Sequence, residues 1–138
     1  MTAIDYLSQT WQADRIINVK LEEVQQLRSL AEKATSVISM SSPSGTRNVH
    51  RMEDTIVKMV DLQNEIAIDI ERLLAVRKDI TDTIGLVENP THQIVLKLRY
   101  LCYKDWDDIA VELKYHRKYI LQLHKLAVKN VEKIKVLT

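Results

Sequence analysis

The sequence is poor in the residues that bend, break or cross-link a chain. Its 138 residues include two glycines, two prolines, one cysteine and no phenylalanine. Two glycines cannot form a glycine-rich loop around a phosphate. A β-rich fold needs turn residues at short spacing, which are missing, and a single cysteine excludes an intrachain disulfide or a cysteine-rich zinc site. The composition therefore favours an all-α fold, with one domain or two small ones.

Targeting signals are also missing. The first residues, Met-Thr-Ala-Ile-Asp, lack the basic and apolar regions of a signal peptide. No stretch approaches the roughly 18 apolar residues that a membrane-spanning helix needs. The lone Cys102 lies among apolar and aromatic residues, where we expect a core role and a reducing compartment. We expect a soluble protein of the cytoplasm that does not contact a membrane.

Two long segments carry apolar residues at the spacing of a coiled coil. From Ile4 to Ile38 one stripe, which includes Trp11, makes ten steps over 34 residues, and from Met52 to Val87 another makes ten steps over 35 residues. Steps of about 3.5 residues are the period of a coiled-coil seam. Residues 39–48, rich in serine with Pro43 and Gly45, predict a loop between them. Residues 1–88 are thus predicted to form a long antiparallel helical hairpin.

Further apolar residues lie off these two stripes. A two-helix hairpin buries one stripe on each helix, so a wider apolar arc needs another partner. That partner is either the C-terminal part of the same chain or a second copy, for example in a four-helix bundle, and we favour a homodimer. The residues concerned are Ile16, Val19, Leu30, Val37, Val57, Val60, Ile68 and Leu74.

Asn89-Pro90 divides the hairpin from a second region, 89–138. Asn is a favoured N-cap and Pro suits the first helical position, which predicts a helix over 90–101. Asp105 is the expected cap of a short helix, with Asp108 reaching back as in a capping box. Lys114-Tyr115 forms the expected turn before a last helix over 116–136. A short helix, a tight turn and a longer helix have the dimensions of a helix-turn-helix, within a three-helix module.

The last helix supplies the candidate DNA-binding residues. With Ile120 and Leu123 inside, the outward side chains predicted to face DNA are His116, Arg117, Lys118, Tyr119, Leu121, Gln122, Lys125 and Lys129. Arg117 and Gln122 suit base edges, whereas Lys118, Lys125 and Lys129 suit phosphates. The alternative is an ordinary three-helix module with a solvated basic face.

Charge is divided unevenly along the chain. Residues 1–89 carry 10 basic and 14 acidic side chains, a net charge of −4, whereas residues 90–138 carry 10 basic and 5 acidic, a net charge of +5. From Leu113 onward seven basic side chains stand against one acid, Glu132, for a net charge of +6. A basic helix on an otherwise acidic protein is the charge pattern expected for phosphate contact.

Three segments then resemble a known family. Leu98-Arg99-Tyr100-Leu101-Cys102, the run from Trp106 to Leu113, and Leu123-His124-x-x-Ala127 resemble the C-terminal module of small phage regulators of the RinA/ArpU type. That module is similar to region 4 of bacterial sigma factors. The resemblance implies a transcriptional activator of late or packaging genes, encoded by a phage or prophage and acting in the bacterial cytoplasm. Two departures stand out: Lys114 replaces the usual turn glycine, and His116 replaces the usual serine cap.

No catalytic, cofactor or metal site is predicted. His116 and His124 are eight residues apart, unlike the i, i+4 pair of a helical metal site, and adjacent Asp107 and Asp108 point about 100° apart on a helix. We therefore expect no enzymatic activity and double-stranded DNA as the partner. Two alternatives stay open: a small terminase subunit, which assembles into a large ring, and an interaction protein that docks on RNA polymerase with weak DNA affinity.

Overall fold

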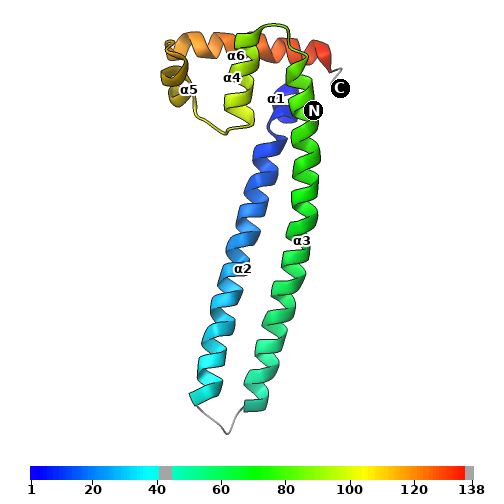
Figure 1. The fold of residues 1–138 in the computed structure, drawn as a ribbon, viewed down its shortest axis with the longest axis vertical. Coiled ribbons are helices and arrows are strands. Elements are labelled where there is room, and N and C mark those ends of the chain that lie inside the picture. The colour runs from blue at the N-terminus through cyan, green and yellow to red at the C-terminus, as the bar shows by residue number, and fades with distance from the viewer. Residues whose placement is uncertain (41–44, 136–138) are drawn as a thin grey trace. The chain divides into compact units, whose positions relative to one another are not determined.

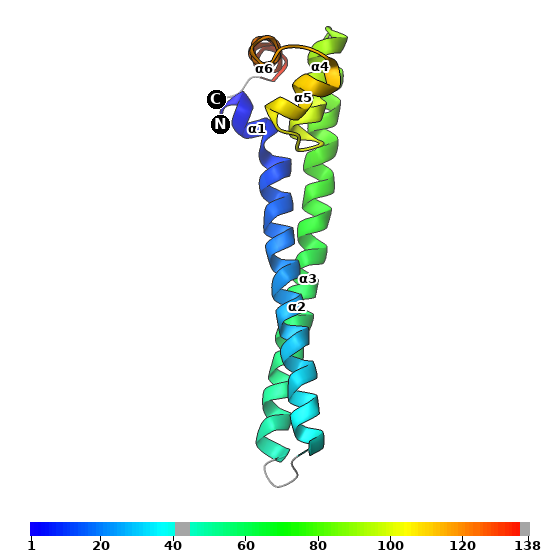
Figure 2. The same ribbon diagram turned by 90° about the vertical axis from the view of Figure 1, so that its left-hand side faces the viewer.

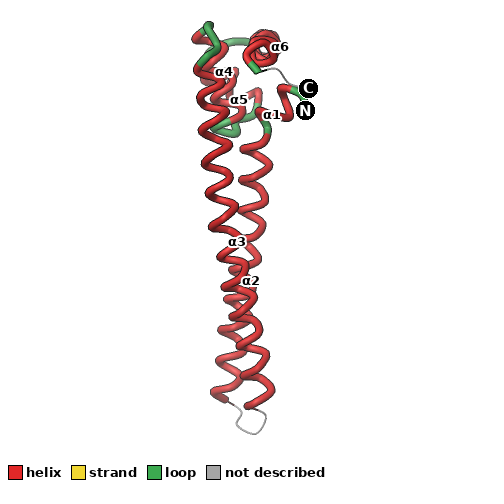
Figure 3. Tube along the Cα trace, turned by 90° about the vertical axis from the view of Figure 1, so that its right-hand side faces the viewer, coloured by secondary structure: helices red, strands yellow, loops and turns green. Residues whose placement is uncertain are grey.

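The chain is built from helices throughout its described part. The computed structural model describes residues 1–40 and 45–135, with no strand among them (Figure 3). Its helices are α1 (Ala3–Leu7), α2 (Gln9–Met40), α3 (Gly45–Gly85), α4 (Pro90–Tyr100), α5 (Trp106–Leu113) and α6 (Arg117–Ile134), as labelled in Figure 1. The prediction of an all-α fold is confirmed.

The boundaries of the long helices differ from the predicted ones, and the last helix, predicted over 116–136, is Arg117–Ile134. The first helix of the predicted hairpin, which carries the stripe from Ile4 to Ile38, is interrupted at Ser8, and the Gln9 side chain there donates to the Tyr6 carbonyl oxygen at 3.0 Å. Thr2 and Asp5 cap α1 reciprocally, each side chain accepting the other's backbone N–H at 3.1 Å. The loop expected over residues 39–48 was predicted too long, because helix continues to residue 40 and resumes at residue 45. Its remaining part, 41–44, lies outside the described residues.

Local capping signals in the sequence set the ends of the shorter helices. The Asn89 side chain accepts from the backbone N–H groups of Thr91 and His92 at 2.9 and 3.3 Å, with Pro90 in the first turn. Asp105 accepts from the Asp108 N–H at 2.8 Å. Both caps are confirmed. The reciprocal bond expected from Asp108 is not found among the described hydrogen bonds of α5.

The chain divides by its contacts into two units, Arg15–Glu71 and Met1–Asp14 with Arg72–Thr138. In the unit Arg15–Glu71, parts of α2 and α3 lie side by side in opposite directions (Figure 2). Ile17, Val24 and Ile66 are each only 5% exposed there. An ion pair joins the same two helices, with Lys20 Nζ 2.6 Å from Asp69 Oδ2 and 3.6 Å from Glu65 Oε2.

Several residues predicted to lie in the apolar seam are on the surface instead. Ile56 and Ile70 are 40% and 41% exposed, and Trp11, in the other unit, is 46% exposed. At the seam beside Ile70 the partly buried residue is Asp69, held by Lys20. The prediction failed there because a charged pair occupies a position that the apolar pattern assigned to its neighbour. Cys102, expected in the core, is also exposed.

The unit of Met1–Asp14 and Arg72–Thr138 contains two apolar clusters. The first gathers Leu7, Ile80, Ile84, Leu96 and Val131 with their neighbours from α1, α3, α4 and α6. The second gathers Val95, Ile109, Ala110, Ile120 and Leu123 from α4, α5 and α6, with Leu98, Trp106 and Leu113 packed against it. Because α4 and α6 contribute to both clusters, these two helices connect the unit's core.

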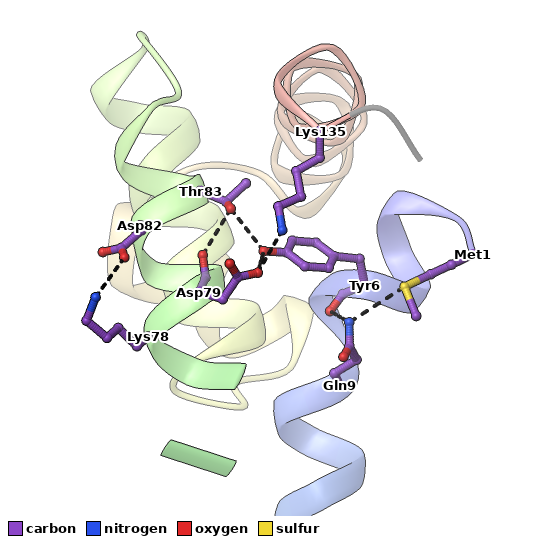
Figure 4. Close-up of polar contacts among 8 residues, drawn as sticks. All are labelled: Met1, Tyr6, Gln9, Lys78, Asp79, Asp82, Thr83 and Lys135. Carbon is purple, nitrogen blue, oxygen red and sulfur yellow. Dashed lines mark hydrogen bonds and ion pairs between the residues drawn. The ribbon is translucent and has the colours of Figure 1, made fainter. Parts of the chain in front are cut away.

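A polar cluster fastens α1 to α3 and to the end of α6 (Figure 4). The Tyr6 hydroxyl donates to the Asp79 carboxylate and lies 2.9 Å from the Thr83 hydroxyl. Lys135 donates to Asp79 at 2.8 Å, and its ammonium lies 4.5 Å from the centre of the Tyr6 ring. The Lys135 ammonium, and after it the Tyr6 hydroxyl, hold the pKa of Asp79 below its usual value. Three distant segments of the chain therefore meet at one carboxylate.

A second group of rings joins α4, α5 and α6. The Tyr100 hydroxyl is 2.6 Å from His124 Nε2, and the ring of His124 meets Trp106 edge-on, with 4.5 Å between centroids. The Arg99 guanidinium lies 4.5 Å from the centre of the Trp106 ring. Burial, with a smaller effect of Arg99, lowers the pKa of His124 from 6.5 to about 4. His124 is therefore neutral in the folded chain near pH 7.

This pKa predicts a loss of stability in mild acid. Below about pH 6.5 the unfolded chain protonates His124 while the folded chain does not, so the free energy of unfolding falls as the pH falls toward 4. Allowing for the partial exposure of the ring, we expect a loss of about 1 kcal/mol from this residue between pH 7 and pH 5. Urea unfolding at both pH values should show a smaller fall for His124→Gln than for the wild type. An equal fall in both proteins would contradict this assignment.

Candidate nucleic-acid interface

The turn between α5 and α6 is closed by backbone bonds around a left-handed lysine. Lys114 has φ 60° and ψ 39°, the only described residue besides Tyr103 with positive φ. The Tyr115 N–H donates to the Ala110 carbonyl at 3.0 Å, and the Lys114 N–H donates to the Val111 carbonyl at 3.3 Å. This pair of bonds is a Schellman motif, in which glycine is the usual left-handed residue. Lys114 thus accepts a conformation that favours glycine.

His116 starts α6 as its N-cap. Its Nδ1 accepts from the Lys118 backbone N–H at 3.1 Å, and α6 begins at Arg117. An imidazole nitrogen therefore satisfies one of the backbone donors that serine or aspartate satisfies in most helices. The side chain of Tyr115, the second residue of the turn, is exposed and meets the Tyr119 ring edge-on.

The outward side of α6 carries a row of lysines. Buried Ile120, Leu123, Ala127 and Val131 define the inward side of the helix. At about 100° per residue, the opposite side carries four polar residues at steps of three or four, and Lys133 follows the last of them by about one turn. These four residues are Lys118, Gln122, Lys125 and Lys129, all exposed. Along the helix axis the row from Lys118 to Lys129 is about 16 Å long. We call these five residues the lysine row.

The described ion pairs leave the lysine row free. None of its four lysines pairs with an acidic side chain among residues 1–40 and 45–135. Exposed, unpaired ammonium groups spaced along a helix make a surface of positive potential that attracts polyanions. Glu132 is the one acidic residue of α6.

The other predicted site residues are exposed but are not gathered on the row. Arg117 and Tyr119 lie on its two flanks, about 200° apart around the helix. Arg117 Nε is 3.3 Å from Asp107 Oδ1 of α5, so this guanidinium is engaged with a carboxylate. Leu121 is exposed beside the row, and His116 serves the cap.

The sequence analysis did not predict Lys133 as a site residue, and it did not predict a ring-lined pocket that includes His124 on the inward side of α6. Lys133 follows Lys129 at i+4, so its place on the row was readable from spacing. The pocket gathers Trp11, Arg99, Tyr103, Trp106 and His124, from segments about 90 residues apart in sequence. The spacing of residues within one helix therefore could not predict this pocket.

Comparisons with known proteins add no relative, since no family model, curated protein or solved structure matches the chain significantly. Of the helices described, none combines the length and apolar character that crossing a bilayer requires.

The left-handed lysine predicts an unusual pair of substitutions. Lys114→Gly should raise the free energy of unfolding by up to about 1 kcal/mol, because glycine adopts positive φ without steric cost. Lys114→Ala removes the same charge but keeps a Cβ, so we expect little change. Chemical unfolding of both variants checks this. If the two variants shifted stability equally, charge rather than backbone strain would explain the effect.

Proposed function

We propose that this protein is a DNA-binding transcriptional regulator encoded by a phage or prophage, with α5 and α6 as its helix-turn-helix. The observation that carries the proposal is the lysine row on α6, the longer helix of the pair. In a helix-turn-helix the second helix enters the major groove while the first crosses the backbone. An eight-residue capped helix, a Schellman turn and an 18-residue helix support this assignment.

Each proposed contact follows from side-chain chemistry. Lys118, Lys125 and Lys129 neutralise phosphates, which gives affinity without sequence information. Gln122, in the middle of the row, offers both a donor and an acceptor to a base edge, as adenine recognition requires. Arg117 pairs with Asp107 in the free protein. On DNA it exchanges that carboxylate for guanine or phosphate acceptors.

Dimerisation completes the proposal. In the unit Arg15–Glu71, α3 carries a second row of exposed residues spaced 4, 3, 4 and 3 apart, namely Ile56, Val60, Gln63, Ala67 and Ile70. This spacing is that of a coiled-coil seam. We propose that a second copy of the chain packs on this row, with the antiparallel hairpin as scaffold. A two-fold dimer presents two recognition helices to half-sites about one DNA turn apart.

A second candidate function is docking on RNA polymerase. Tyr119 and Leu126 lie seven residues apart on one flank of α6, and both are exposed, as is Leu121. Exposed aromatic and aliphatic side chains beside a basic row suit a protein contact made next to DNA. Arg117→Ala with Lys118→Ala separates the two functions. Unchanged DNA affinity with lost transcriptional activity favours the polymerase.

DNA binding is tested by charge removal on the row. The triple variant Lys118→Ala, Lys125→Ala, Lys129→Ala should weaken binding to a DNA duplex and lower the slope of log affinity against log salt by up to about 3, or about 0.9 for each phosphate contact. Mobility-shift titrations at several salt concentrations give both quantities. The duplex is taken from the late promoter region of the phage that encodes the chain.

The matched control removes three exposed lysines elsewhere, Lys33, Lys58 and Lys78, which changes net charge equally. We expect it to bind nearly as well as the wild type. If both triple variants lost the same DNA affinity, the loss would come from net charge and not from the lysine row. If the wild type bound the promoter duplex no more strongly than random DNA, even at low salt, sequence-specific regulation would be ruled out.

The dimer row is tested with two isoleucines on opposite sides of α3. Ile70, 41% exposed, lies on the row, whereas Ile68, 51% exposed, lies about 160° away around the helix. Ile70→Lys should shift the mass measured by light scattering toward the monomer, because the proposed interface would have to desolvate an ammonium group in place of an apolar side chain. Ile68→Lys should keep the wild-type mass. A monomeric wild type contradicts the dimer, and a large ring favours a packaging protein.

A further inference from the structure

The ring-lined pocket has the size of a small-molecule site. It lies within the unit of Met1–Asp14 and Arg72–Thr138 and has a volume of about 510 Å³. Sites for small ligands span roughly 300–1,000 Å³. Its lining comes from α1, the first turn of α2, α4, the loop before α5, α5 itself and α6, through Ile4, Ser8, Trp11, Gln12, Arg99, Tyr100, Tyr103, Trp106 and His124.

Aromatic rings dominate this lining. The chain has two tryptophans and five tyrosines, seven aromatic residues in all, and both tryptophans and two of the tyrosines line the pocket. The imidazole of His124 adds a fifth ring. Rings in offset or edge-on contact favour a flat aromatic guest over a branched aliphatic one.

The rings are held in place by contacts with one another, with Arg99 and with the backbone of Thr10. Trp106 lies between the Arg99 guanidinium and the His124 ring, each 4.5 Å from the centre of its ring. His124 is in turn hydrogen-bonded to the Tyr100 hydroxyl. The Tyr103 hydroxyl donates to the Thr10 carbonyl at 3.4 Å. Tyr103 also has φ 60°, a conformation that costs a non-glycine residue energy. Strain of this kind is concentrated at functional sites, where the surrounding structure imposes it.

One charge faces the pocket, and it is positive. Among residues 1–40 and 45–135, Arg99 is the only Lys, Arg, Asp or Glu that lines the pocket. Its Nη1 donates to the Lys104 carbonyl at 3.0 Å. A guanidinium has five N–H donors, so donors are left over, and its planar fork matches a carboxylate. The hydroxyl of Ser8 and the amide of Gln12 add neutral polar groups to the lining.

We propose that this pocket binds a small aromatic carboxylate, with the ring against the tryptophans and the carboxylate on Arg99. This site does not depend on DNA binding, because its residues lie on the inward side of α6 and on other elements. Occupation would link α6, through His124, to α4 and to the first turn of α2.

The chain supplies its own reporters for the test. Only Trp11 and Trp106 carry indole N–H groups, so a ¹H–¹⁵N spectrum contains two such signals, both from the pocket. Three probes share a ring and differ in charge: indole-3-acetate, indole-3-acetamide and tryptamine. Indole-3-acetate should shift both signals saturably and bind about tenfold more tightly than the amide, the value of a charged hydrogen bond. Tryptamine should bind most weakly.

Two variants locate the binding energy. Arg99→Gln should weaken indole-3-acetate binding about tenfold and leave the amide unchanged, whereas the control Arg72→Gln, on the exposed surface of α3, should change neither. Trp11→Ala, at an exposed wall, should weaken both probes several-fold and keeps the test valid if Arg99→Gln fails to fold. Equal affinity for the acid and the amide, or unmoved tryptophan signals at millimolar probe, would overturn the proposal.

Discussion

Burial of the apolar side of α6 is the constraint on which the arrangement of the unit of Met1–Asp14 and Arg72–Thr138 depends. Ile120 and Leu123 complete one cluster, and Ala127, Val128 and Val131 complete the other. A helix that enters two cores cannot rotate about its axis without exposing one of them. The opposite side is fixed as firmly as the buried one, so the lysines stand outward because of packing and not because of their own contacts. His124, at the edge of the inward side, lines the pocket.

Much of this unit was predictable because its signals are local. The Asn89 and Asp105 caps, the inward residues of α6 and its exposed face follow from spacings of two to four residues. The exposure of all eight candidate site residues follows from the same periodicity. Sequence also identified Lys114 and His116 as departures from a glycine turn and a serine cap. Backbone geometry now shows how both residues are accommodated, by a left-handed lysine and an imidazole acceptor.

The long helices were less predictable, because their apolar residues form two rows and one chain pairs with only one of them. The stripe of apolar residues in steps of three or four includes Ile56 and Ile70, which belong to the exposed row and not to the buried seam. The structure instead gives a seam position to Asp69, since Lys20 on the facing helix neutralises it. The prediction for Trp11 was wrong for a related reason, because Trp11 lines a pocket together with residues about 90 positions away in the sequence, among them Arg99 and Tyr103. A contact that one residue makes with a distant segment, unlike a seam along two helices, leaves no periodic trace in a sequence.

The Tyr6, Asp79 and Lys135 cluster has a consequence for how α6 opens. Its last turn is tied to α1 and α3 through a carboxylate, a phenol and an ammonium group. The polar contacts of its first turn are the His116 cap and the exposed Arg117–Asp107 ion pair, and the strained Lys114 precedes them. The two ends of the helix therefore differ in local stability. We expect opening to begin at the turn and to proceed toward Lys135. The residues that would meet a partner first are those that can still adjust to it, while the far end keeps the helix aligned.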